Sequence, residues 1–183
     1  MKKLLILTLT ALALISSASA QFLAGTDFTA DLPEYQAGFT LTDNSNSITA
    51  VGSDAIGNSF SLYFDTEVDM SALGTSNSAS LEFVANPGHS ANSSFSISLF
   101  DSGFAASYDL AGFNFSDSSL VGTGSNGGVN LSAIAGMTIT TGGLTGSPVN
   151  VDVSSFTVVP EPSTYALIAG FAAFLFVAIR RRK

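Results

Sequence analysis

Short runs in which apolar and polar residues alternate fill the middle of this sequence. The clearest run is Asn58–Asp65, where every second residue from Phe60 to Phe64 is apolar. Because successive side chains of a strand point to opposite faces, this period of two predicts a half-buried β-strand. Similar runs recur between clusters of Asn, Asp, Gly and Ser, which predicts about eight to ten short strands joined by turns. The expected fold class is all-β, an antiparallel β-sandwich or jelly roll.

The bounds of the expected elements come from the same pattern. Two segments, 21–32 and 121–129, show no alternation and are interpreted as a lead-in and a glycine-rich loop. Helical turns are expected at 69–73, with Asp69 as the N-cap, and at 130–134. In the last strand Ser154-Ser155 shifts the apolar phase, which predicts a β-bulge. The predicted strands are 35–42, 47–51, 58–65, 79–85, 94–100, 104–110, one within 111–120, 137–141 and 149–159.

The charges are segregated along the chain. All six Lys and Arg residues lie at positions 2–3 and 180–183, whereas all 14 acids lie between Gln21 and Ile179, so this interval carries a formal charge of −14. Nucleic acid, anionic lipid and polyanionic sugar are therefore poor partners, while neutral glycans, divalent cations and basic partners remain open. Cysteine is absent, which excludes disulfides and thiol chemistry. A hydrophobic core must hold the fold, and the 139 residues of 21–159 suffice for one domain.

The N-terminus has the three regions of a secretory signal peptide. Two lysines precede the apolar run Leu4–Ile15, and small residues come after it. The run is short for a membrane span, which favours a cleaved signal over an anchor. Ala18 and Ala20 predict a cut before Gln21 by signal peptidase, so residues 1–20 are assigned as the signal peptide.

The C-terminus combines a rigid break, an apolar segment and a basic end. Pro160 and Pro162, on either side of Glu161, separate the preceding domain from the apolar segment, because proline fixes its own φ and restricts the residue before it. Residues from about 164 to 179 are expected to form a transmembrane helix of marginal length. The basic tail is expected to stay in the cytoplasm as a membrane stop and consists of Arg180, Arg181, Arg182 and Lys183.

This arrangement resembles the PEP-CTERM sorting signal of exported bacterial proteins. The resemblance covers 160–183 and rests on Pro-Glu-Pro-Ser-Thr-Tyr-Ala-Leu, the short apolar segment and the terminal arginines. It implies recognition of Pro160, Glu161 and Pro162 by exosortase, an integral-membrane transpeptidase, in bacteria that make exopolysaccharide. It further implies a membrane-anchored precursor that is then delivered to the cell surface or outside the cell. An ordinary C-terminal membrane anchor is the alternative.

The order of elements from Asp69 to Val158 resembles jelly-roll carbohydrate-binding modules of the galactose-binding-like type. Such modules often stack sugars on Trp, and this chain has none. Other aromatic residues can stack on sugar rings if they lie on polar-facing or edge positions. Partial burial in the second sheet or under loops is the alternative. The candidates for glycan stacking are Tyr35, Tyr63, Phe100 and Tyr108.

Alternating carboxylates suggest a calcium site. Asp65, Glu67 and Asp69 offer the oxygen ligands that this hard cation prefers. Asp152 lies in the last strand, where the resembled jelly rolls often place a structural calcium ligand. A solvated strand end with a helix cap is the alternative interpretation of the first three, and the simpler one. Calcium is the one cofactor left open.

No motif in the sequence assigns a catalytic residue. Gly122–Gly127 spells G-x-G-x-x-G but lacks the strand-and-helix context of a dinucleotide site, so it is interpreted as a flexible loop. His89 is the only histidine, no G-x-S-x-G elbow accompanies it, and an exposed loop position is expected. The expected function is a non-catalytic, exosortase-sorted surface or extracellular-matrix protein associated with exopolysaccharide. The alternatives are a carbohydrate-binding module, with or without calcium, and a small anchored hydrolase.

Overall fold

The computed structural model describes residues 21–30, 36–76, 78–117, 119–158, 170–172 and 174. The predicted signal peptide, the Pro160-Glu161-Pro162 motif, the basic tail 180–183 and Tyr35 lie outside these residues, as does most of the predicted membrane helix. Among the residues that are described, no helix combines the length and the apolar character needed to cross a bilayer.

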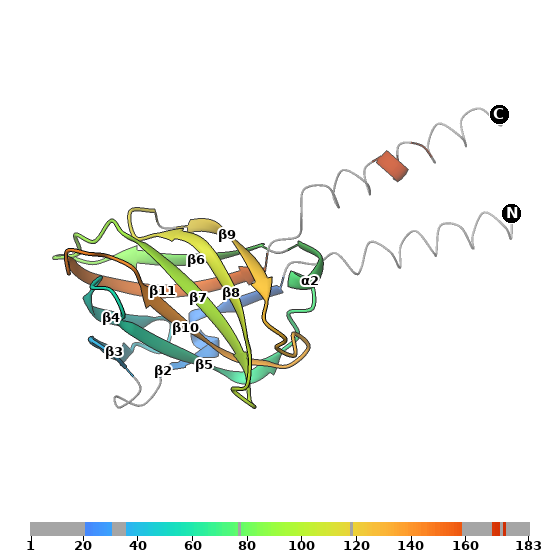
Figure 1. The fold of residues 1–183 in the computed structure, drawn as a ribbon, viewed down its shortest axis with the longest axis horizontal. Helices are drawn as coiled ribbons and strands as arrows, with labels where there is room; N and C mark the ends of the chain where they lie inside the picture. The colour runs from blue at the N-terminus through green and yellow to red at the C-terminus, as the bar shows by residue number, and fades with distance from the viewer. Residues whose placement is uncertain are drawn as a thin grey trace, which may run out of the picture.

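In the described part of the chain, eleven strands form one sheet that folds over into two facing layers (Figure 1). The strand order is β2-β5-β10-β7-β8-β9-β6-β11-β4-β3, and β1 pairs with β11. All of these strand pairs are antiparallel, as predicted. The strands are β1 Gln21–Ala24, β2 Phe28–Ala30, β3 Phe39–Asp43, β4 Ile48–Ser53, β5 Ser59–Val68, β6 Ser78–Ala85, β7 Ser94–Asp101, β8 Ser107–Asn114, β9 Ser119–Asn126, β10 Ile134–Thr141 and β11 Pro148–Val158.

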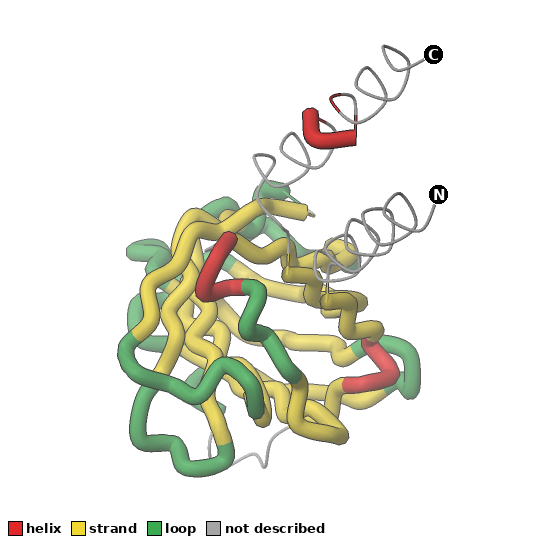
Figure 2. The backbone as a smooth tube through the Cα atoms, turned by 90° about the vertical axis from the view of Figure 1, so that its right-hand side faces the viewer, coloured by secondary structure: helices red, strands yellow, loops and turns green. Residues whose placement is uncertain are grey.

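Two short helical turns accompany these strands, η2 (Gly25–Asp27) and α2 (Leu73–Ser76). Figure 2 looks onto the end of the sandwich that carries α2. The turn expected at 69–73 therefore forms slightly later. Asp69 accepts hydrogen bonds from the main-chain N–H (2.9 Å) and hydroxyl of Ser71, and these bonds lower the pKa of Asp69. The turn expected at 130–134 has a hydrogen bond from Ala133 N to Asn130 O (3.1 Å) but no helix.

The inward side chains of both layers make one hydrophobic core. Alternate residues of β7 and of β11 are buried, as their sequence patterns predict. Aromatic rings join the layers, with centroid distances of 4.8 Å between Phe39 and Phe60 and 6.3 Å between Phe83 and Phe95. Each large apolar side chain that is fully buried contributes about 1.5–3 kcal/mol. The described residues contain no Lys, Arg or Cys. This core therefore stabilises the domain without disulfides and without ion pairs to lysine or arginine.

The predicted bulge in the last strand is confirmed. The register between β11 and β6 shifts between Val153 and Ser155, and Phe156 and Val158 keep their side chains in the core. The prediction for 21–32 is wrong, because this segment contains β1 and β2. These strands have four and three residues, too few to display an alternation.

The glycine-rich segment 121–129 is also not a flexible loop. Most of it belongs to β9, which pairs with both β8 and β6. A Cβ at Gly124 would lie 2.3 Å from Cε1 of Tyr108, so glycine is needed there for close packing. The single strand expected within 111–120 is divided, because residues up to Asn114 continue β8 and β9 begins at Ser119.

Candidate functional site

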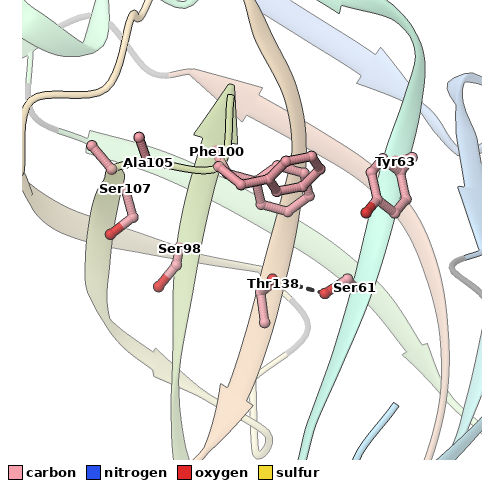
Figure 3. Close-up of a pocket in the computed structure, with 9 residues that line it drawn as sticks. Ser61, Tyr63, Ser98, Phe100, Ala105, Ser107 and Thr138 are labelled. Carbon is pink, nitrogen blue, oxygen red and sulfur yellow. Dashed lines mark hydrogen bonds between the residues drawn. The ribbon is translucent and has the colours of Figure 1, made fainter. Parts of the chain in front are cut away.

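A row of aromatic side chains crosses the outer face of the layer β5-β10-β7. The register pairs Gly136 of β10 with Tyr63 of β5 and with Phe100 of β7. A Cβ at position 136 would lie 2.6 Å from Cζ of Phe100, so the Phe100 ring lies over the bare glycine. The rings of Tyr63 and Phe100 meet edge to face, with centroids 5.4 Å apart (Figure 3).

Phe104 extends this row from the loop between β7 and β8. Its ring stacks on Phe100 at 5.1 Å and approaches Tyr63 edge-on at 6.2 Å, yet Phe104 is 59% exposed. Its φ of 52° is left-handed, which costs a residue with a Cβ roughly 1–2 kcal/mol. The turn is held by Asp101, whose main-chain O accepts from Phe104 N (3.1 Å) and whose Oδ1 accepts from Gly103 N (3.0 Å). Strained backbone that presents an exposed aromatic side chain is typical of binding sites.

A row of hydroxyl groups lies beside the aromatic row. Thr138 stands between Ser61 and Ser98 in the register, and the Ser61 and Thr138 hydroxyls are hydrogen-bonded at 2.8 Å (Figure 3). Because directly opposite residues of antiparallel strands share a face, all three side chains point to the same side as Tyr63. Hydroxyl groups both donate and accept hydrogen bonds, so this row can match a partner that does the same.

The two rows and the β7–β8 loop line an open pocket of about 690 Å³. All of its lining residues are neutral. Two exposed acids neighbour the lining residues on the same layer: Asp65 follows Tyr63 by two residues on β5, and Asp109 of β8 pairs with Ser98 of β7. The lining residues are Ser61, Tyr63, Ser98, Phe100, Phe104, Ala105, Ala106, Ser107 and Thr138.

Of the four aromatic residues predicted to stack on sugar, the structure brings Tyr63 and Phe100 together. Tyr108 does not lie on a polar-facing position. It is fully buried opposite Leu99, its hydroxyl donates to Leu73 O at 3.2 Å, and burial raises the pKa of Tyr108. Sequence reasoning missed Phe104 because it was assigned to a strand. The turn residues directly before it were the available signal, since they place it in a loop.

The four predicted calcium ligands do not converge. In the part of the chain that the structure describes, no group of three or more His, Asp or Glu side chains could hold a metal. Asp65 instead accepts a hydrogen bond from Thr29 Oγ1 at 2.7 Å, and Glu67 is exposed. Asp65, Glu67 and Asp69 therefore do not form the calcium site that their spacing predicted, and Asp152, which was predicted separately, lies on β11 of the other layer.

Asp152 belongs to a hydrogen-bond network on the outer face of the other layer. Its Oδ1 accepts from Thr49 Oγ1 at 2.5 Å and from Asn86 Nδ2 at 2.9 Å. Asn44 Nδ2 donates in turn to Thr49 Oγ1. These bonds tie β4 and β11 to the residue directly after β6.

His89 is half-buried rather than exposed. Its Nδ1 accepts a hydrogen bond from Asn150 N at 3.2 Å, and its Nε2 lies 3.3 Å from Phe115 O. Both ring nitrogens therefore engage the main chain, which fixes the loop after β6. This arrangement gives His89 a structural role.

Residues 158–183 match the family described as the PEP-CTERM protein-sorting motif. The chain thus carries this motif at its C-terminus, as the sequence predicted, and the motif implies export and exosortase processing. The match lies almost wholly outside the described residues. Among curated proteins, none matches this sequence significantly.

Solved structures similar to the sandwich include carbohydrate-binding modules. A low-affinity xylan-binding module of family CBM86 from Roseburia intestinalis has a TM-score of 0.51 and 10% identity, with 80% of this chain and 98% of that chain covered. Module CsCBM6-3 of Clostridium stercorarium, solved with cellobiose, has a TM-score of 0.42 and 10% identity, with 77% and 94% covered. An agarase has a TM-score of 0.47 and 14% identity over 78% of this chain and 25% of its own. At 10% identity the likeness to the CBM86 module shows the fold alone, and it confirms the expected sandwich.

Proposed function

We propose that this protein is an exported, exosortase-sorted surface or extracellular-matrix protein without catalytic activity, and that its sandwich binds a neutral polysaccharide. The sorting half of the proposal is supported by the PEP-CTERM match at 158–183 and by the signal-peptide pattern of residues 1–20. The binding half is supported by the pocket on the outer face of β5-β10-β7. The membrane-anchored precursor, signal peptidase and exosortase as partners, and delivery to the cell surface belong to the first half.

The observation that carries the binding half is an exposed aromatic ring beside a row of hydroxyl groups. A pyranose ring has faces of C–H groups and a rim of hydroxyls. The C–H face can pack on Phe104, which Phe100 supports from behind. The sugar hydroxyls can then exchange hydrogen bonds with Ser98 and Thr138 in the adjacent row. One sugar unit can thus contact the aromatic row through its C–H face and the hydroxyl row through its hydroxyl groups.

The charges select a neutral ligand. The pocket lining is neutral, the acids Asp65 and Asp109 flank it, and the chain from 21 to 179 has no Lys or Arg to pair with a uronate. Like charges brought together disfavour binding, so acidic polysaccharide is rejected. The xylan ligand in the name of the structurally similar module supports the same ligand class. The carbohydrate-binding alternative includes a requirement of glycan binding for calcium. Electrophoresis with and without chelator tests this requirement.

Affinity electrophoresis tests the binding half. We expect migration to be retarded in gels that contain xylan or mixed-linkage glucan, with and without chelator, and not in gels that contain polygalacturonate. Phe104→Ala should weaken retardation about 5- to 10-fold, which corresponds to roughly 1–1.4 kcal/mol of stacking. Phe22→Ala is the matched control, because Phe22 is equally exposed, at 60%, but lies on β1. No retardation by any neutral polysaccharide, or equal loss in both variants, would contradict the proposal.

Two further measurements test the sorting half and the absence of catalysis. The intact mass of protein recovered from membrane and from medium should show cleavage before Gln21 and processing near Pro160. Prolonged incubation with the bound polysaccharide should release no reducing ends. Release that disappears when a single Asp or Glu is replaced would instead support the anchored hydrolase.

A further inference from the structure

The sorting motif begins inside the folded sandwich. The family match starts at Val158, which is the last residue of β11 and is fully buried. In the sequence only Val159 stands between this strand and Pro160. An enzyme that cuts the chain near Pro160 must therefore work directly beside the sheet.

Both edges of β11 are occupied where the motif begins. The register places Val158 opposite Gln21 of β1 on one edge and opposite Ala79 of β6 on the other. Because β6 also pairs with the part of β11 that β4 contacts, β1 and β4 lie on the same edge. The pairing with β4 ends at Val153, so β1 covers this edge over Ser155–Val158. Detachment of β1 would leave the main chain of these residues unpaired on that side.

Of its two neighbours here, β1 detaches from β11 more easily. It has four residues and, in the described part of the chain, pairs with β11 alone. The strand β6 has eight residues and also pairs with β9. Leu23 is the one large apolar side chain that β1 places in the core, since Phe22 is 60% exposed. Terminal segments with few buried contacts open at low cost in free energy.

The chain is fixed again directly after β1. Ala24 N donates a hydrogen bond to Asp27 Oδ2 at 2.8 Å. A Cβ at Gly25 would lie 2.1 Å from Asn46 O, so Gly25 packs closely against the turn between β3 and β4. The segment before Gly25 can therefore open while η2 and β2 stay in place.

We propose that exosortase docks on the edge of β11 at Ser155–Val158, and that β1 competes with the enzyme for this edge. The proposal rests on the sorting function proposed above. Proteins take up extended segments by adding them as a strand to a sheet edge, with main-chain hydrogen bonds supplying affinity. The residues before the motif offer such an edge only when β1 is detached. This strand is thus a strap that limits the rate of C-terminal processing.

A disulfide between β1 and β11 tests the strap, because the chain has no cysteine of its own. Phe22 and Thr157 are direct partners, and the Cα atoms of antiparallel partners lie about 4.5–5.5 Å apart, which a disulfide spans. In pulse-chase labelling of the exporting cells, we expect Phe22→Cys/Thr157→Cys to accumulate precursor that keeps its C-terminal signal. A reductant in the medium should restore processing. Thr40→Cys/Val51→Cys is the matched control, because it locks β3 to β4 and should be processed at the wild-type rate.

A looser β1 should have the opposite effect. Leu23→Ala removes the main buried contact of this strand and should speed C-terminal processing about 5-fold or more. Leu41→Ala is the matched control, because it makes the same change on the edge strand β3 and should leave the rate unchanged. Thermal unfolding of the purified variants shows whether each is folded.

The outcomes separate this proposal from the sorting function on which it rests. Wild-type processing of the β1–β11 lock would overturn the proposal, as would equal slowing by the β3–β4 lock. Folded Leu23→Ala that is processed no faster than the wild type would also contradict it. A wild type that keeps its C-terminal signal throughout would instead contradict the sorting function itself.

Discussion

The two outer faces of the sandwich use similar residues in different ways. On the face of β4, β11 and the end of β6, the polar groups bond to one another, since Asn44 donates to Thr49, and Thr49 and Asn86 both donate to Asp152. On the opposite face an aromatic row and a hydroxyl row line a pocket. The first face satisfies its own hydrogen-bonding capacity, and the second leaves donors, acceptors and an exposed ring for a partner. A composition rich in Ser, Thr and Asn therefore does not locate a site, whereas the strand register does.

Gly136 is the residue on which the open face depends most. We expect Gly136→Ala to place a methyl group 2.6 Å from both Leu62 O and Phe100 Cζ, which costs roughly 1–3 kcal/mol of stability and displaces the Phe100 ring. The affinity for polysaccharide should also fall, because the displaced Phe100 ring no longer supports Phe104. Gly74→Ala is the matched control, because its nearest neighbour lies 3.8 Å away and alanine favours the helix by about 0.5–1 kcal/mol. Urea unfolding and affinity electrophoresis of both variants measure the difference. Wild-type stability of Gly136→Ala would contradict the packing described for this face.

Asp152 tests the hydrogen-bond network on the outer face opposite the pocket. Asp152→Ala removes the acceptor shared by Thr49 and Asn86, and we expect a loss of about 1 kcal/mol in the free energy of unfolding. Retardation by polysaccharide should be unchanged, because the residue lies on the layer opposite the pocket. Asp152→Asn keeps an acceptor and should lose less. A variant that unfolds normally but no longer binds glycan would show that the wrong face has been assigned.

The buried Tyr108 tests the core beneath the layer that carries the pocket, through the stability of the domain at alkaline pH. Burial raises the pKa of Tyr108, so its stabilisation is complete below the ordinary pKa of about 10 and is lost as the pH rises above it, when the unfolded chain ionises first. Tyr108→Phe should lose about 1 kcal/mol at neutral pH with its hydrogen bond to Leu73 O. It should also show a smaller alkaline fall in stability than the wild type. Urea unfolding at neutral and alkaline pH measures both effects, and parallel pH profiles would place the ionising tyrosine elsewhere.

The sandwich could be predicted because its signals are local. Alternation in β5 and β7 and the phase shift at Ser154-Ser155 are visible within a single strand. The edge strands β1 and β2 could not be predicted, since their pairing with β11 and β5 decides their structure.

The candidate site was only half predictable. Tyr63 and Phe100 were both among the predicted aromatics, but Phe100 is buried beneath the Phe104 ring, and the row that joins Phe100 to Tyr63 requires Gly136, which is distant from both in sequence. Tyr108 was misplaced although it shares its alternation phase with the buried Leu110.

The central claim is that the Phe104 ring, which a strained backbone presents to solvent, binds the ligand. The variant Phe104→Gly tests this claim most directly. Glycine tolerates the φ of 52°, so the substitution removes the ring and the backbone strain together. Calorimetric titration with a soluble neutral oligosaccharide, combined with thermal unfolding, gives affinity and stability from one sample. We predict affinity reduced at least 5-fold and a Tm equal to or above that of the wild type. Unchanged affinity, or a Tm well below that of the wild type, would contradict the claim and make Phe104 a structural residue.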